Sequence, residues 1–549
     1  MRNNKISFRP NLFLLLAFAC LLYLLSFSQQ RNLPLNRDIL LTIDKNICKI
    51  DSAPAFHSGF KPFLESTCSS YLPAITKDTS GIKRKLLTRK LFHEHLFIVN
   101  DSADNFFLTI DPLFNFEYGK DIKDNANTTL YKNTRGILVG GNIGQKFSFE
   151  SSFLENQARF TGYIDDQIQF SNNLFPNKIN YPYLVIPGQG RAKSFKNSSY
   201  DFAMAAGYVS YSPSKHFNFQ AGTGKHFVGN GYRSLLLSDN AFNYPFLRIT
   251  TTYNKLQYTN LYTAFMNLTD GGVTSPPGTE RLFQKKAGSF QMLNWNINKR
   301  IQLGFFQGLI AQATDSTNKM KLHLSYANPI LLFNSLVYGL SNENNILLGS
   351  TIHIKLSNSV SLYGQYMIDD IGSNTSVNNK NGFQAGVKYF DLFGFKNLHL
   401  QAEYNQVSPY SYSHAKPSQS YTHYNQALAH PLGANFKEVV GIVNYNKGRF
   451  FIKGKINYAT MRKDSSGINF GNNIFKSDII ASSVSQNNGL KTTLKMIDTS
   501  IGYIINPSTN LSIIAGLSNR FYSNNKKFSE TQFFYIGIST SLTNVYYDF

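Results

Sequence analysis

Cysteine is scarce in this chain, and long apolar helices are missing from it. Only 3 of the 549 residues are cysteine, and they form no repeated C-x-x-C pairs, so a structural zinc site or a disulfide-dense scaffold is excluded. After the first 28 residues there is also no apolar run of the roughly 20 residues that a membrane-spanning helix needs. These absences exclude a helical membrane protein, but not a chain that crosses lipid with paired strands.

The sequence also lacks the motifs of common catalytic sites. It contains no G-x-S-x-G elbow and no H-E-x-x-H pair. Gly224 and Lys225 are followed by His226, where a phosphate-binding Walker loop needs Ser or Thr. Asp369 and Asp370 are adjacent, and adjacent strand residues point to opposite faces, which argues against a shared catalytic site. We therefore predict a protein that is not an enzyme and has no cofactor or metal.

The first 28 residues have the pattern of a secretory signal peptide. Arg2, Lys5 and Arg9 precede an apolar run from Leu12 to Leu25, and the serines after it predict cleavage behind Ser28. Cleavage would leave 549 minus 28, or 521, residues in the exported chain.

Two cysteines, Cys48 and Cys68, belong to this exported part. In an oxidising periplasm they could form one disulfide that closes a small N-terminal loop. The sequence alone leaves both the disulfide and two free thiols open, because it does not show whether the two Cα atoms approach.

Basic residues outnumber acidic ones by a wide margin. The formal net charge is +22, and removal of Arg2, Lys5 and Arg9 with the signal peptide leaves +19. In the cytosol such an excess would point to nucleic acid, but export removes that partner. The polyanions at a bacterial surface are lipopolysaccharide phosphates and acidic polysaccharides, which become the expected partners of basic loops and a basic lumen. The alternative is that the excess charge only keeps a solvated surface soluble.

Apolar and polar residues alternate from about residue 106 onward. Examples are Thr351–Leu356 and Leu398–Tyr404, in which His353 and Glu403 sit between apolar neighbours. Such strands turn one side to lipid and the other to a polar lumen. At ~24 residues per strand and connection, residues 106–549 predict an all-β, antiparallel transmembrane barrel of about 18 strands, within the range 16–20. A soluble β-sandwich repeat is the alternative architecture.

Aromatic residues are abundant, with 46 Phe and 32 Tyr beside a single Trp. Barrels place aromatic side chains in girdles at both membrane interfaces. Val545, Tyr547 and Phe549 occupy alternate positions at the carboxyl end, a pattern typical of the insertion signal that barrel-insertion machinery reads in a final strand. We therefore interpret these three residues as a barrel insertion signal.

Residues 29–105 lack this alternation and are expected to form an N-terminal periplasmic or plug segment. Between Thr79 and Asn100, apolar residues fall on roughly one side of a helix and basic residues on the other. This pattern predicts a short amphipathic helix. It would pack against the barrel mouth or, alternatively, lie on a membrane surface.

A long loop is expected between Gln406 and Glu438, in a stretch rich in Pro, Ser, Asn and Gly. Long loops of barrels are normally extracellular, and tyrosine rings and imidazoles suit contact with sugars. The alternatives are a constriction inside the lumen and a loop packed on its own tyrosines. A metal site is disfavoured, because the histidines are widely spaced and have no acidic ligands nearby. The candidate polysaccharide-binding residues are Tyr410, Tyr412, His414, Tyr421, His423, Tyr424 and His430.

Five blocks of sequence occur in a characteristic order between residues 105 and 540. They are NTRGILVGGNIG (Asn133 to Gly144), GTGKHFVGNGYRSLLLSDNAFNYPFLRI (Gly222 to Ile249), NPILLFNS (Asn328 to Ser335), LYGQYMIDD (Leu362 to Asp370) and HPLGANFKE (His430 to Glu438). With these blocks the chain resembles the capsule-assembly Wzi family. It looks most similar to the Bacteroidetes branch of that family, which includes the gliding-motility protein RemB.

This resemblance implies an outer-membrane barrel of a Gram-negative bacterium that binds surface polysaccharide and assists the attachment or assembly of capsule or exopolysaccharide. The alternatives are a gliding-motility or adhesion component that acts through protein partners, such as motility or capsule-export proteins, and a diffusion porin. Within the motif we expect the glycines to permit a tight turn, and Arg233 and Asp239 could form a buried pair in the lumen. The motif residues are Gly229, Gly231, Arg233, Ser238, Asp239 and Asn240.

Overall fold

The structure is a computed structural model of the chain, and the predicted signal peptide lies outside the residues that it describes. The described residues are 30–50, 56–69, 71, 85–101, 103–124, 128–173, 184–196, 198–268, 283–314, 324–338, 344–370, 380–465, 467–479 and 489–549.

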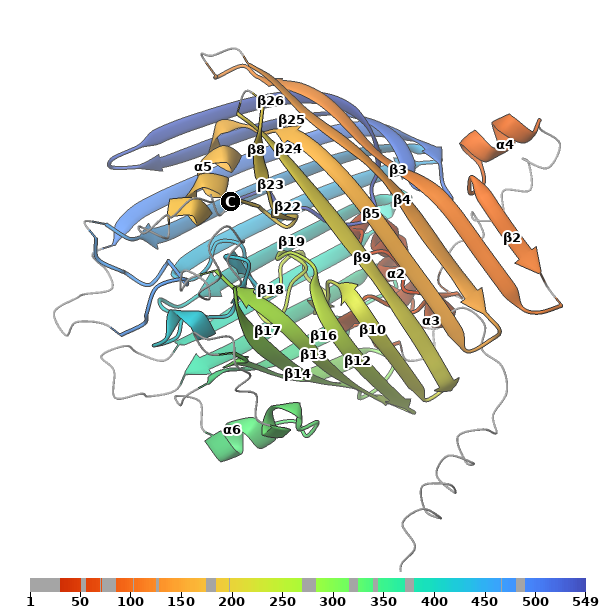
Figure 1. Ribbon diagram of the computed structural model, residues 1–549, viewed down its shortest axis with the longest axis horizontal. Helices are drawn as coiled ribbons and strands as arrows, with labels where there is room; N and C mark the ends of the chain where they lie inside the picture. The colour runs from red at the N-terminus through yellow and green to blue at the C-terminus, as the bar shows by residue number, and fades with distance from the viewer. Residues whose placement is uncertain are drawn as a thin grey trace, which may run out of the picture.

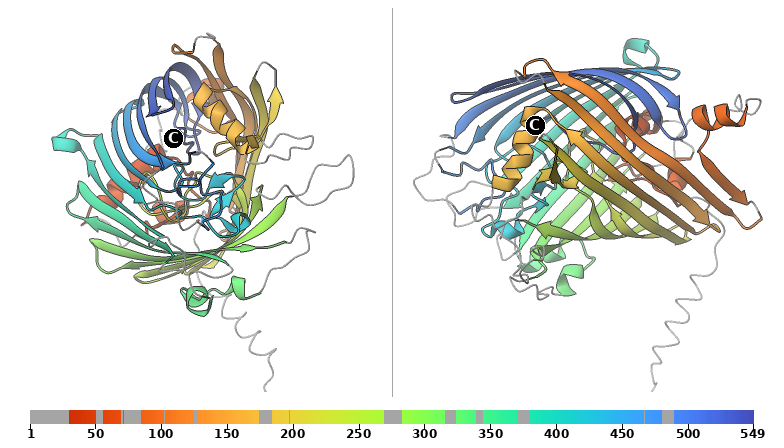
Figure 2. Two further views of the ribbon diagram at one scale, coloured as in Figure 1. Left: turned by 90° about the vertical axis from the view of Figure 1, so that its left-hand side faces the viewer. Right: turned by 45° about the horizontal axis from the view of Figure 1, so that its top comes forward.

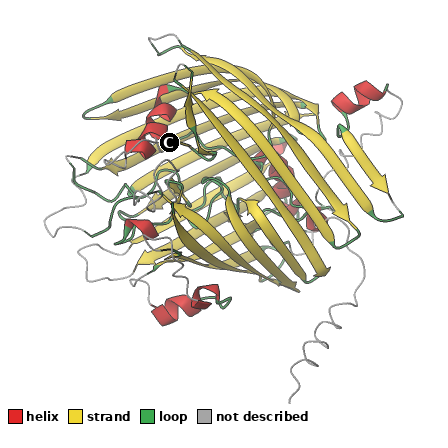
Figure 3. Cartoon of the chain, in the orientation of Figure 1, coloured by secondary structure: helices red, strands yellow, loops and turns green. Residues whose placement is uncertain are grey.

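Eighteen antiparallel strands form a closed barrel, which confirms the predicted fold class (Figures 1 and 3). Each strand pairs with the next along the chain, and β26 closes the barrel on β3, with Ser539 opposite Asn115. Closure leaves every strand with two neighbours, so the backbone groups are paired within the wall. The strands are β3 (Phe106–Asp121), β4 (Thr129–Ile143), β5 (Phe147–Arg159), β9 (Ser199–Ser214), β10 (Phe217–Gly224), β12 (Tyr244–Tyr253), β13 (Leu256–Asn267), β14 (Gln284–Asn296), β15 (Ile301–Gln312), β16 (Asn345–Lys355), β17 (Val360–Asp370), β18 (Lys380–Phe390), β19 (Leu398–Val407), β22 (Phe436–Lys447), β23 (Phe450–Lys463), β24 (Leu490–Asn506), β25 (Leu511–Asn524) and β26 (Phe528–Thr540).

The alternation in the sequence corresponds to the two faces of this wall. On β24, Ile497 and Ile501 are exposed on the outside, whereas Leu494 and Met496 are buried inside the barrel. A strand with this pattern can face lipid on one side and a packed lumen on the other. In the described part of the chain, we find no helix with both the length and the apolar character needed to cross a bilayer.

The two ends of the barrel differ in the length of their connections. At one end β9 and β10 are joined by residues 215–216, and β22 and β23 by residues 448–449. At the other end the connections include residues 225–243, 408–435 and 464–489. Bacterial barrels have short periplasmic turns and longer extracellular loops, so we assign the second end to the cell exterior.

Besides the N-terminal segment, three segments fold into the lumen. The inward loop is residues 225–243, the tyrosine loop is residues 408–435, and the C-terminal tail is residues 541–549. The first two loops contribute many members of the main buried apolar cluster, among them Leu236 and Tyr421. The lumen is therefore packed with protein at the depth of the strands.

The N-terminal segment enters the lumen from the turn end (Figure 1). Helix α2 (Arg37–Cys48) begins at Asn36, whose side chain accepts hydrogen bonds from the backbone of Asp38 and Ile39. Before it, the Asn32 side chain donates to Gln220 of β10 over 3.0 Å. The remaining short elements are β1 (Phe60–Lys61), α3 (Glu65–Cys68), α4 (Leu86–Phe92), β2 (Phe97–Asp101), α5 (Gly162–Asn173), β6 (Val185–Ile186), β7 (Gly190–Arg191), β8 (Lys193–Phe195), β11 (Phe227–Val228), η3 (Leu324–Ala327), α6 (Phe333–Tyr338), η4 (Leu392–Gly394), η5 (Pro417–Gln419), β20 (Thr422–His423) and β21 (Gln426–Ala427).

The disulfide considered from the sequence is not formed. Cys48 and Cys68 are both free and buried. Cys48 ends α2 and donates a hydrogen bond to the carbonyl of Ser357 in a barrel turn, whereas Cys68 packs in a cluster with Ile43 and Phe63. The two thiols therefore have different surroundings, each satisfied without a covalent bond.

The residues predicted as the insertion signal do not lie in the last strand. Strand β26 ends at Thr540, and the C-terminal tail then turns back into the lumen, where Figures 1 and 2 show the chain end inside the barrel. Val545, Tyr547 and Phe549 consequently lie outside any strand. Val545 is exposed whereas Tyr546 and Asp548 are buried, so burial alternates along the tail as it does along a strand.

Candidate binding site at the loop end of the barrel

The two glycines of the motif make the tight path of the inward loop possible. Gly229 has a φ of 102°, and a Cβ there would lie 2.0 Å from the Nε2 atom of Gln365. A Cβ on Gly231 would lie 2.6 Å from the Arg233 carbonyl and from a carboxylate oxygen of Glu403. Only a residue without a side chain fits at these positions.

Arg233 is buried as expected, but its predicted pairing with Asp239 is wrong. Its guanidinium lies 3.0 Å from Glu438 of β22 and 3.0 Å from Asp548 of the C-terminal tail. Lys455 of β23 also contacts Asp548, over 2.8 Å. A buried arginine requires carboxylates close enough to offset its desolvation, and here two distant segments supply them.

Asp239 instead holds the C-terminal tail. Its carboxylate accepts a 2.8 Å hydrogen bond from the Asn544 side chain and another from the Tyr546 hydroxyl. The neighbouring motif residues face the tyrosine loop: the backbone amide of Ser238 donates to Leu428, and the Asn240 side chain donates to Ala427. The motif therefore joins the inward loop to two other lumen segments.

Most rings of the tyrosine loop point inward, which corrects their predicted role in polysaccharide binding. Tyr410, Tyr412, Tyr421, His423 and His430 are at most 1 % exposed. The hydroxyls of Tyr412 and Tyr421 donate to the carbonyls of Leu235 and Leu236 over 2.8 and 2.7 Å.

The buried histidines also form hydrogen bonds within the protein. His423 lies between the Met266 amide, 3.0 Å away, and the Asn243 carbonyl, 3.2 Å away. Burial lowers the pKa of His423 to about 3, so the ring is neutral. His430 contacts Glu438 over 2.7 Å. His414 and Tyr424 keep partly exposed side chains.

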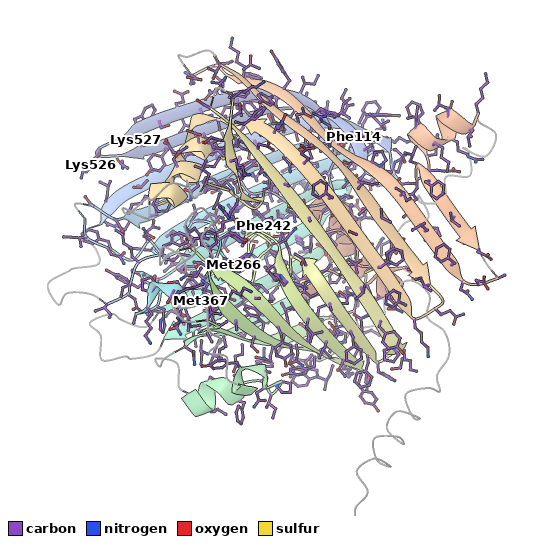
Figure 4. All side chains as sticks on the ribbon, in the orientation of Figure 1. Phe114, Phe242, Met266, Met367, Lys526 and Lys527 are labelled. Carbon is purple, nitrogen blue, oxygen red and sulfur yellow. The ribbon has the colours of Figure 1, made fainter. Side chains whose placement is uncertain are left out.

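A cavity of about 440 Å³ opens at the loop end of the barrel, and we call it the mouth cavity. Its size is within the range of ligand sites. Helix α5, the tyrosine loop, the 464–479 loop, the upper ends of β23 and β25 and the end of the C-terminal tail surround it. Figure 4 shows Lys526 and Lys527 at this end of the molecule. The lining includes Tyr163, Asp166, Phe170, Asn240, Asn425, Gln426, Lys463, Asn472, Asn473, Phe475, Arg520, Tyr522, Lys527 and Phe549.

Aromatic rings and cations are interleaved in this cavity. The Arg520 guanidinium lies over the rings of Tyr163 and Tyr522, at 4.4 and 5.1 Å from their centroids, and donates to a main-chain oxygen of Phe549 over 3.0 Å. The ammonium of Lys463 lies 5.3 Å from the Tyr522 ring. Such contacts fix the orientation of both the rings and the cations.

The cavity lining also includes further rings and amides. Phe170 of α5 and Phe475 of the 464–479 loop have centroids 6.3 Å apart. Asn472 and Asn473 also line the cavity, and the Asn472 amide donates to the carbonyls of Leu432 and Ala434. Rings offer faces for the C–H surface of a sugar, amides both donate to and accept from hydroxyls, and arginine and lysine bind carboxylates. This combination of groups suits a polar, partly anionic ligand.

None of the seven residues predicted to bind polysaccharide lines the mouth cavity, whereas Asn240 and Phe549, predicted for other roles, do. The missed residues come from α5, from the loop after β23 and from strand ends. The sequence around Asn469 to Phe475, NFGNNIF, has the amides and rings that could have indicated the loop contribution. No sequence signal shows that strand ends far apart in the chain meet there.

No protein-family model matches the chain. No curated protein matches it either. Among solved structures, the chain is similar to Escherichia coli Wzi, described as an outer membrane protein involved in group 1 capsule assembly and a carbohydrate-binding β-barrel. That match has a TM-score of 0.54 and 14% identity, and it covers 92% of this chain and 98% of the other.

Two other similar structures are Acinetobacter baumannii OccAB2 and Pseudomonas aeruginosa OprD. The first has a TM-score of 0.42 and 11% identity, covering 79% of this chain and 97% of its own. The second has a TM-score of 0.40 and 10% identity, covering 78% of this chain and 94% of its own. At these identities the likeness to Wzi concerns the fold, which is a closed antiparallel β-barrel.

Proposed function

We propose that this protein is a non-enzymatic barrel that binds surface polysaccharide in the mouth cavity and assists the attachment or assembly of capsule or exopolysaccharide. The observation that carries the proposal is a cavity open at the loop end, lined by rings, amides and cations, above a lumen packed with protein. The similarity of fold to E. coli Wzi, which is described as carbohydrate-binding, supports the same function.

The packed lumen favours a binding protein over a diffusion porin. The inward loop, the tyrosine loop and the C-terminal tail share one buried apolar and ionic core, in which Arg233 and Asp548 are fully enclosed. A porin needs a continuous aqueous path. In planar bilayers we therefore expect no steady large conductance from the wild-type protein, and a porin-like conductance would contradict the proposal.

The resemblance of the motif to the RemB-containing branch supports a second role in gliding motility or adhesion through protein partners. Deletion of the gene separates the two roles, if capsule retention and surface spreading are scored independently. Polysaccharide binding predicts loss of capsule. Normal capsule with lost spreading would favour the motility role instead.

A direct test measures binding of the detergent-folded protein to polysaccharide purified from the same cells. Phe475→Ala removes a ring from the cavity wall, and Lys463→Ala removes a cation. Each change should weaken binding by about 1 kcal/mol, or roughly fivefold. The matched control is Lys416→Ala, because Lys416 is an exposed lysine of the tyrosine loop outside the cavity. Equal binding by all four proteins would remove the mouth cavity from the mechanism.

A further inference from the structure

Helix α4 leaves its apolar side chains uncovered. Leu86 is 67 % exposed, Leu87 71 % and Leu91 48 %, and no residue of the helix is buried. In Figure 1 the helix lies outside the barrel, beyond the turn end of the strands. Adjacent leucines rarely face water on a stable protein surface, so this face requires an apolar neighbour.

The C-terminal end of the same helix is fixed to the barrel. The Asn506 side chain, at the end of β24, donates hydrogen bonds to the carbonyls of Lys90 and Glu94 over 3.2 and 2.8 Å. The Ser508 hydroxyl, in the following turn, donates to the carbonyl of His93 over 2.7 Å. The helix is therefore held at the level of the barrel turns rather than tethered loosely.

Aromatic residues mark the same level on the barrel wall. Phe450 and Tyr503 project outward at the turn ends of β23 and β24, with ring centroids 4.8 Å apart. Tyr503 lies three residues before Asn506. Paired rings at a strand end are typical of the girdle at a membrane interface. This places α4 at the periplasmic border of the apolar band.

Strand β2 connects α4 to the lipid-facing wall. Phe97 pairs with Ile110 and Val99 with Leu108 of β3, so these side chains share a face. On β3 the intervening Thr109 is buried on the lumen side. The outward apolar face therefore continues through exposed Phe97 to the leucines of α4.

The charge of the segment suits one kind of neighbour. The sequence has five basic residues between positions 83 and 90, and Glu94 is the acidic residue next to them. Glu94 pairs with both Arg89 and Lys90, over 3.1 and 3.4 Å, so the segment keeps a positive excess. Basic residues beside an uncovered apolar face are typical of helices that lie in a membrane interface with anionic lipid.

We propose that α4 lies in the headgroup region of the periplasmic leaflet, with Leu86, Leu87 and Leu91 among the acyl chains and its basic residues on phospholipid phosphates. The helix thereby extends the lipid contact of the barrel beyond its strands. This inference depends on the fold and not on polysaccharide binding.

The test uses tryptophan fluorescence of the full chain in vesicles of phosphatidylethanolamine and phosphatidylglycerol. The single Trp295 is first replaced, as Trp295→Phe, and a reporter is introduced as Leu87→Trp. Lipids brominated near the top of the acyl chains should quench this reporter at least twofold, as they should quench Phe97→Trp. Lys416→Trp, at an exposed position of the tyrosine loop, is the matched control and should stay unquenched.

Two results would overturn the proposal. One is a Leu87→Trp reporter that acrylamide quenches as strongly as it quenches Lys416→Trp, because the helix would then be exposed to water. The other is a reporter shielded from both acrylamide and bromine, which means a protein neighbour. Exchange of Lys85, Arg89 and Lys90 for glutamine should lower bromine quenching in anionic vesicles and leave it unchanged in vesicles of neutral phosphatidylcholine. The heat-dependent mobility shift on gels confirms that each variant is folded.

Discussion

The carboxylate of Asp548 holds the C-terminal tail in the lumen, and its replacement is a direct measure of that attachment. The group is fully buried, 3.0 Å from Arg233, 2.8 Å from Lys455 and 2.6 Å from the Tyr232 hydroxyl. Burial alone would raise the pKa of Asp548, but the attraction of Arg233 and Lys455 outweighs it and holds that pKa well below the usual range. Asp548→Asn keeps the shape and removes the charge.

The free-energy cost of this substitution depends on which carboxylates still pair with Arg233 and Lys455. Loss of one partner from a buried ion pair costs about 3–5 kcal/mol. Arg233 keeps Glu438 and Lys455 keeps Asp498, so we expect the lower end of the range, about 3 kcal/mol. That corresponds to a shift of roughly 100-fold in the ratio of released to docked tail.

Carboxypeptidase digestion of the detergent-folded protein measures this ratio. The enzyme can only degrade a released tail, so the rate of phenylalanine release follows the released population when docking is fast. We expect about 100-fold faster release from Asp548→Asn than from wild type. The matched control is Asp166→Asn, which makes the same chemical change in the exposed pair of Asp166 with Lys527. Equal rates in wild type and Asp548→Asn would refute the reasoning, as would an equal acceleration by the control.

Three further changes test other parts of the lumen. Gly229→Ala forces a side chain onto a positive φ and against Gln365, so urea unfolding in detergent should show a loss of about 2–3 kcal/mol, whereas an unchanged midpoint would contradict the assigned backbone. Tyr421→Phe removes the hydrogen bond to the Leu236 carbonyl and should cost about 1 kcal/mol in the same assay, while polysaccharide binding stays unchanged because the ring is buried. The pKa of His423 in the folded protein, about 3, lies below its value of about 6.5 in the unfolded chain. Below pH 6.5 the unfolded chain therefore binds more protons than the folded protein. The stability contributed by the neutral ring should be present above pH 6.5 and lost progressively as the pH falls toward 3. His423→Gln should flatten this pH dependence, and an identical profile in wild type and variant would exclude the histidine as its source.

The barrel could be predicted from the sequence because its signal is local. A strand such as β24 repeats its two faces every second residue, and closure follows when enough such strands occur in succession. The count of about 18 also depended only on length per strand. The contents of the lumen are different, since they depend on contacts between segments hundreds of positions apart.

Arg233 illustrates that limit. Its burial was foreseeable from the motif, but the nearby Asp239 was the only partner that the sequence suggested. The actual partners, Glu438 and Asp548, are 205 and 315 positions away along the chain. Which charges pair in a lumen depends on which segments enter it, and no local sequence pattern predicts which segments do.

The tyrosine loop shows a second limit, which is chemical rather than topological. A tyrosine that stacks on a sugar and one that spans a packed core need the same features: an apolar ring and a hydroxyl with a partner. In Tyr412 and Tyr421 the partners are the carbonyls of Leu235 and Leu236, so these rings bind the protein's own inward loop. Because these rings are buried in the lumen, the mouth cavity is lined instead by α5, the 464–479 loop and the strand ends. The packing that closes the lumen thus also shapes the floor on which a polysaccharide would rest.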